Sequence, residues 1–137
     1  MFIKDSYYDK KTIEKVNNLV GKPYGLIEVF KIGRIGSPKL KIIATCNKIG
    51  SVINIDNSLK SCNIELRPNG IIVRFKARLD TYLLCIPYYK LSIFNTTKTV
   101  TTIYCDTYKI SIDNSNFTAF KNKIYHYKAK HSENFIF

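Results

Sequence analysis

The segment from Cys62 to Arg78 constrains the fold more than any other part of this sequence. Apolar and polar residues alternate on both sides of Asn69-Gly70, a dipeptide that favours a type I′ turn. With these two residues at the centre of the turn, the apolar pairs are Leu66–Val73, Ile64–Phe75 and Cys62–Ala77, and the polar pairs are Glu65–Arg74 and Asn63–Lys76. The pattern predicts a β-hairpin with one buried face, because a slip of one residue would mix the two faces.

Further strand-like segments lie on both sides of this hairpin. They either alternate with a period of two or are rich in β-branched and aromatic residues, as strands are. The predicted strands are Leu26–Ile32, Leu40–Cys46, Ser51–Asp56, Thr81–Ile86, Tyr89–Phe94, Thr99–Tyr104 and Thr107–Ile112. Turn-forming residues separate them, which predicts a mainly antiparallel sheet.

Both ends of the chain carry a helical pattern. Asp9 is a suitable N-cap for a first helix, which Gly21 and Pro23 would end. Its apolar stripe is Ile13, Val16, Leu19 and Val20. A second helix would begin after Asn114 or Ser115, with an apolar stripe of Phe117, Phe120, Ile124 and Tyr127.

The length of 137 residues is sufficient for one hydrophobic core. We therefore expect a single domain over 1–137, with an N-terminal helical segment (1–22), a β-sheet core (26–112) and a C-terminal helix (114–131). Many short strands and one late helix predict an α+β fold, a curved antiparallel sandwich or partly open barrel capped by the C-terminal helix. The start of the chain lacks the apolar run of a signal peptide, and no run reaches the roughly 20 residues of a membrane span, so we expect a cytoplasmic protein.

The formal net charge of +12 predicts a salt-sensitive attraction to polyanions. Lysine supplies most of it, since the arginines are Arg34, Arg67, Arg74 and Arg78. The chain is also rich in Ile, Asn, Tyr and Phe, which share AT-rich codons with lysine. The charge therefore has two explanations, an anionic partner or the base composition of the gene.

The sequence offers no arrangement typical of a catalytic or metal site. The two histidines, His126 and His131, are five residues apart and would not share one helix face. The four cysteines, Cys46, Cys62, Cys85 and Cys105, are widely separated and fit reduced core thiols, with a disulfide or metal framework as the alternative. We expect no enzyme activity, no metal and no cofactor.

The run Ile86-Pro87-Tyr88-Tyr89-Lys90-Leu91, the strands before and after it and the terminal helix resemble the bacterial pleckstrin-homology-like (PH/GRAM-like) superfold. The resemblance covers roughly Leu40 to Lys130. Pleckstrin-homology domains usually have a tryptophan in the last helix, and this chain has none, so Phe117 or Phe120 would fill that space. The resemblance implies a binding scaffold, which can host unrelated ligands.

Two groups of basic residues are candidate ligand-binding sites. The resemblance implies that basic residues on the first hairpin hold an anionic headgroup; if 26–46 forms that hairpin, they are Lys31, Arg34, Lys39 and Lys41. On the predicted strand after Gly70, alternation places Arg74, Lys76 and Arg78 on one face, where they could bind nucleic acid or simply be solvated.

We expect the chain to be a non-catalytic binding module. An open sheet offers a strand edge and a groove beside the helix, and both suit a protein or peptide partner. The alternative is an anionic phosphate ligand, either a lipid headgroup or nucleic acid. An enzyme that the sequence does not reveal is the third possibility.

Overall fold

The computed structural model describes residues 1–4, 9–53, 60–77 and 80–133, and in these ranges eight strands form one antiparallel sheet that is not closed. The strand order is β1-β5-β4-β3-β2-β8-β7-β6. The strands are β1 (Phe2–Lys4), β2 (Leu40–Thr45), β3 (Ser61–Arg67), β4 (Gly70–Ala77), β5 (Asp80–Pro87), β6 (Ser92–Asn95), β7 (Val100–Cys105) and β8 (Tyr108–Asp113). The predicted α+β class and antiparallel sheet are confirmed.

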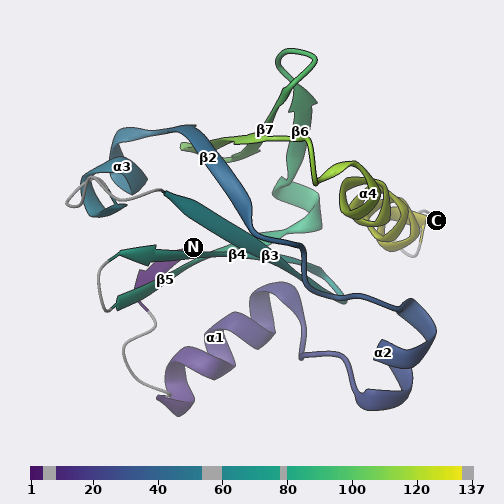
Figure 1. Ribbon diagram of the computed structural model, residues 1–137. Coiled ribbons are helices and arrows are strands. Elements are labelled where there is room, and N and C mark those ends of the chain that lie inside the picture. The colour runs from purple at the N-terminus through teal and green to yellow at the C-terminus, as the bar shows by residue number, and fades with distance from the viewer. Residues whose placement is uncertain (5–8, 54–59, 78–79, 134–137) are drawn as a thin grey trace.

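The sheet bends at β2, which belongs to both of its halves. Leu40 and Lys41 pair with β3, whereas Ile42 to Thr45 pair with β8, and the register shifts between Ile42 and Ala44. An irregularity of this kind bends a strand and increases its twist. The half β1-β5-β4-β3 therefore lies across from the half β8-β7-β6, and Figure 1 shows the two layers.

Four α-helices and one 3₁₀ turn are placed around this bent sheet in the described ranges. They are α1 (Lys10–Val20), α2 (Leu26–Ile32), α3 (Asn47–Ile53), η1 (Tyr88–Lys90) and α4 (Thr118–Glu133). Figure 1 shows α1 beneath the β3-β4-β5 layer and α4 beside the open end between the layers. Val16 and Val20 of α1 pack on Ile72, Leu83 and Cys85, which forms a second, smaller core.

The main core lies between the two halves of the sheet. It joins side chains such as Ile64 and Phe75 from one half to Ile103 and Ile110 from the other. Phe117, Phe120 and Ile124 are buried in the same core, so the apolar stripe predicted for the last helix is confirmed. The first helix is confirmed as well, since the Asp9 carboxylate accepts a hydrogen bond from Lys11 N and Gly21 ends the helix with a φ of 90°.

The predicted register of the β3–β4 hairpin is wrong by two residues. Leu66 pairs with Ile71, and the turn residues are Pro68 and Asn69, neither of which has a positive φ. Gly70 is instead the first residue of β4. A glycine is needed there because a Cβ would lie 2.8 Å from Pro87 Cα and closer still to the Ile86 carbonyl oxygen. A shift of two keeps the described side chains of both strands on their predicted faces, whereas a shift of one would have reversed them.

The first predicted strand, Leu26–Ile32, is the helix α2. Its helical hydrogen bonds include Gly33 N to Val29 O at 2.8 Å. The predicted hairpin would have paired 26–32 with β2, but β2 pairs with β3 on one side and with β8 on the other. The segment 26–32 is therefore left without a strand to pair with.

Other predicted elements are also corrected by the structure. In the predicted strand 51–56, residues 51–53 belong to α3 and the remainder lies outside the described residues. Strand β6 begins only at Ser92, because η1 takes the residues after Pro87. Residues 2–4, expected in a helical segment, form β1 at one edge of the sheet, and α4 begins at Thr118 rather than directly after Ser115.

Candidate binding site between α2 and α4

A hollow of about 420 Å³ lies between α2 and the C-terminal part of α4. The turn between β3 and β4 contributes two further residues to it. Its lining residues are Tyr24, Glu28, Lys31, Ile32, Pro68, Asn69, Tyr127, Lys130 and His131. We name this site the α2–α4 hollow.

The β3–β4 turn is held firmly in place beside this hollow. Asn69 N donates to Val20 O at the end of α1 (2.8 Å), and Asn69 O accepts from Tyr88 N (2.9 Å). The buried phenol of Tyr88 donates to Arg67 O at 3.0 Å. Hydrogen bonds from two separate segments therefore fix the turn, which gives the hollow a rigid wall.

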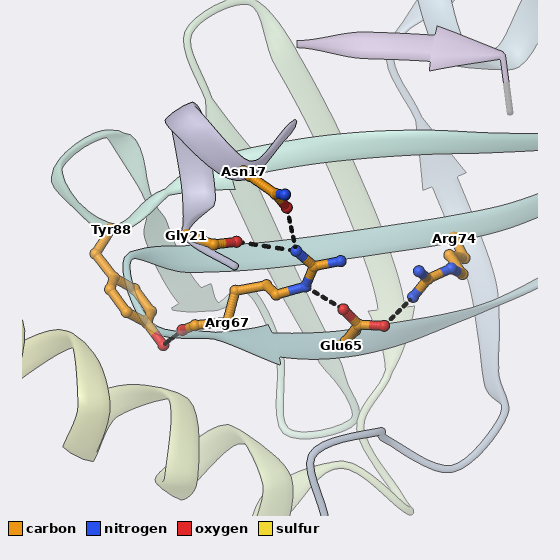
Figure 2. A network of polar contacts seen from close by, with 6 residues as sticks. All are labelled: Asn17, Gly21, Glu65, Arg67, Arg74 and Tyr88. Atoms are coloured by element: carbon orange, nitrogen blue, oxygen red, sulfur yellow. Dashed lines mark hydrogen bonds and ion pairs between the residues drawn. The ribbon is translucent and has the colours of Figure 1, made fainter. Parts of the chain in front are cut away.

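The start of the segment that leads to α2 is fixed by a buried arginine (Figure 2). Arg67 is 7% exposed and donates to the carbonyl oxygen of Gly21 (2.9 Å) and to Asn17 Oδ1 (3.2 Å). It also pairs with Glu65, whose other carboxylate oxygen accepts from Arg74 at 2.7 Å. A guanidinium at the C-terminal end of α1 complements the helix dipole and satisfies a terminal carbonyl group.

The charges of this network lower the pKa of Glu65. Burial alone would raise it, but the hydrogen bond from Arg67 and the positive charges of Arg74 and Arg67 outweigh burial. The pKa of this carboxyl therefore lies below its ordinary value, and Glu65 is an anion between two cations at neutral pH.

The α2–α4 hollow combines tyrosine side chains with charged residues of both signs. Burial, helped by Tyr127 and Glu28, raises the pKa of Tyr24 to about 12, so this phenol remains a neutral hydrogen-bond donor. The His131 ring lies 5.5 Å from the Tyr88 ring, centroid to centroid. Among the described residues that line the hollow, two are lysines, Lys31 and Lys130, and one is a carboxylate, Glu28, so this lining favours an anionic group.

The basic residues that the resemblance implied are not gathered at one site. Lys31 lines the α2–α4 hollow, and Arg34 lines another of about 230 Å³ that also includes Lys123. Lys39 lines a third hollow of about 380 Å³, while Lys41 is exposed on β2. The physical reason is that 26–32 is a helix, so the hairpin that would have aligned these residues does not exist.

The second predicted group is described only in part. Arg74 lines the same hollow as Lys39, together with Ser61, Asn63 and Thr81, but its guanidinium is already paired with Glu65. The side chain of Lys76 and the whole of Arg78 lie outside the described residues.

Most residues of the α2–α4 hollow were not predicted from the sequence. Both helices supply residues with the same spacing of i, i+3 and i+4, namely Glu28, Lys31 and Ile32 from α2 and Tyr127, Lys130 and His131 from α4. Such spacing places side chains on one helix face. This spacing is present in the sequence, but it indicates a shared face only if 26–32 is a helix, and that segment was predicted to be a strand.

The outward side of α2 is apolar and exposed. Leu26 is 91% exposed, Ile27 75% and Phe30 90%, and α2 contains no buried residue. Side chains this large and apolar are seldom gathered in water without a role in binding.

The described ranges contain no helix with the length and apolarity to cross a membrane, and no group of three His, Cys, Asp or Glu residues placed to hold a metal ion. Comparison of the chain with known protein families, with curated proteins and with solved structures found no match.

Proposed function

We propose that this chain is a non-catalytic binding module and that the α2–α4 hollow receives a short acidic segment of a partner protein. The observation that supports this proposal is a concave site with tyrosines, an isoleucine and an excess of lysine beside a rigid turn. Tyrosine is enriched at protein interfaces, because it offers apolar area together with a hydrogen-bonding group.

The size and charge of the hollow fit a peptide better than a single ion. A volume of about 420 Å³ holds several side chains or a small organic group. Lys31 and Lys130 come from different helices and can bind carboxylates of the partner, while Glu28 would repel a wrongly placed acidic group. Tyr24 and Tyr127 would pack on the apolar side chains between those carboxylates.

The order of the elements supports the further proposal that the scaffold is PH-like. A meander of four strands (β2 to β5) precedes a meander of three (β6 to β8), and a helix at the open end follows. The resemblance implies this plan, and α4 forms one side of the hollow. The helix α2 precedes the first meander and supplies the other side.

The test uses a display library of random peptides selected on the immobilised wild-type chain. We expect enriched peptides to carry Asp or Glu beside aromatic or aliphatic residues. Titration calorimetry should show that Lys31→Glu and Lys130→Glu each weaken binding about tenfold or more, which is about 1.4 kcal/mol. The matched control is Lys15→Glu, which reverses an exposed lysine on α1 and should leave the affinity unchanged. Peptides with no acidic enrichment, or equal affinity for all three variants, would contradict the proposal.

A further inference from the structure

The outward side of α2 is a second surface, distinct from the α2–α4 hollow. Successive residues of an α-helix are rotated by about 100°. Leu26 and Phe30 therefore lie on the side of α2 opposite to Glu28 and Ile32, which line the hollow. Ile27 lies beside Lys31, at the border between the two sides. A ligand in the hollow would leave these apolar side chains uncovered.

The structure holds α2 in place while leaving this side exposed. Tyr24 and Ile32, at the two ends of the segment, pack partly against the main core. Lys123 Nζ of α4 donates to Arg34 O, just beyond α2, at 2.8 Å. Figure 1 shows α2 at the periphery of the molecule, away from both layers of the sheet. The apolar side chains therefore form a convex surface on a helix that is fixed at both ends.

The segment that contains α2 carries mainly positive charge. Within 22–34 the basic residues are Lys22, Lys31 and Arg34, and Glu28 is the one acidic residue. Lys22, Lys31 and Arg34 are all exposed. Apolar side chains next to exposed cations are the combination with which helices enter the boundary between headgroups and acyl chains of anionic lipids.

We propose that α2 inserts Leu26, Ile27 and Phe30 into the interface of an anionic lipid surface, with the neighbouring lysines and arginine among the headgroups. A convex surface enters a soft interface directly, whereas a protein partner would need an apolar groove of matching shape. A second copy of the chain fits less well, because each copy carries a charge of +12 and three side chains give far less than the roughly 800 Å² per partner of a stable interface.

General magnitudes indicate reversible binding. Full burial of one Leu, Ile or Phe side chain changes a partition constant by roughly 10- to 150-fold. Each lysine or arginine near an anionic surface contributes about fivefold. Loss of all three apolar side chains should therefore weaken vesicle binding by more than about 100-fold, and charge alone should not restore it.

The chain contains no tryptophan, so one introduced tryptophan reports its own environment. Phe30→Trp places the probe on α2, and Phe94→Trp is the matched control, because Phe94 is also exposed (60%) but lies on β6. Both variants are mixed with vesicles of phosphatidylcholine alone or with phosphatidylglycerol added. We expect the emission of Phe30→Trp to shift to the blue and to be quenched by brominated acyl chains with the anionic vesicles only, and that of Phe94→Trp to stay unchanged.

A second variant replaces Leu26, Ile27 and Phe30 with serine, and it should fold normally because all three side chains are exposed. Its partition constant for anionic vesicles, measured by co-sedimentation, should fall by more than about 100-fold, and its melting temperature should stay unchanged. Two results would overturn the proposal. One is sedimentation of the wild type without a blue shift of Phe30→Trp, which would mean adsorption by charge alone. The other is no sedimentation at all, which would point to a protein partner for this side of α2. Neither result depends on peptide binding in the hollow.

Discussion

Replacement of Arg67 by methionine should lower the free energy of unfolding by about 3 kcal/mol. The change removes the hydrogen bonds to Gly21 O (2.9 Å) and Asn17 Oδ1 (3.2 Å), and the ion pair with Glu65. Breaking a buried ion pair costs about 3–5 kcal/mol when its partner is left alone. The lower end applies here, because Glu65 keeps Arg74 at 2.7 Å and methionine restores part of the apolar packing.

Arg74→Met is the matched control, because it removes the other arginine of the same carboxylate from a more exposed position (34% of the side chain). Ion pairs near the surface contribute about 0–1 kcal/mol to stability. The free energies of unfolding of the two variants, measured with urea, should therefore differ by about 2 kcal/mol or more. A loss below about 1 kcal/mol for Arg67→Met, or equal losses in both variants, would refute the view that Arg67 fixes the end of α1. A double-mutant cycle with Glu65→Gln then isolates the pair from the two bonds to α1.

The same network gives a pH dependence whose direction is fixed by the pKa of Glu65. Its pKa in the folded chain lies below its ordinary value, which is about 4.3 in unfolded peptides. The contribution of Glu65 is therefore fully present above the unfolded pKa and is lost as the pH falls through the folded pKa. Below about pH 4 the free energy of unfolding of the wild type should fall more steeply with decreasing pH than that of Glu65→Gln. Parallel curves of unfolding free energy against pH for the two proteins would show that the network does not lower the pKa of Glu65.

Two further expectations concern close packing and burial. Gly70→Ala should lower the free energy of unfolding by about 2 kcal/mol or more, because the new Cβ would meet the backbone of β5. The control is Gly36→Ala, because no heavy atom lies within 4 Å of a Cβ placed there. Equal losses of stability in the two variants would contradict the reasoning. Burial raises the pKa of Cys62 to about 12 and that of Cys85 to about 11, so both thiols should react with a disulfide reagent far more slowly in the folded chain than in denaturant. Labelling at equal rates in the two states would show that these cysteines are not shielded.

The sequence was a good guide wherever periodicity and burial agree. On β3 and β4 the predicted core residues Cys62, Ile64, Leu66, Val73 and Phe75 are in the core, because the predicted and the observed register differ by an even number of residues. The turn dipeptide misled the prediction, since Gly70 is needed where β4 passes close to β5. That contact joins residues about sixteen positions apart in the sequence, and local turn preferences do not report it.

The α2–α4 hollow was harder to predict, because it joins three segments that only the fold brings together. The apolar stripe of α4 could be read directly, and it is buried as expected. The residues that line the hollow lie at the border of that stripe, where Tyr127 is half-buried and Lys130 is exposed. Nothing local distinguishes such residues from an ordinary solvated helix face.

The wrong assignment of 26–32 and the proposal of a lipid-facing helix have one physical origin. A strand was predicted because the segment was interpreted as alternating with a period of two, which would place alternate apolar side chains in the core of a sheet. In the structure β2, the predicted partner of 26–32, pairs with β3 and β8, and α2 leaves Leu26, Ile27 and Phe30 exposed. Apolar side chains that find no place in the core of their own chain lower the free energy only when something else covers them. We proposed an anionic lipid surface as that cover because the segment that contains α2 is basic, so the residues that misled the fold prediction are those on which the binding proposal depends.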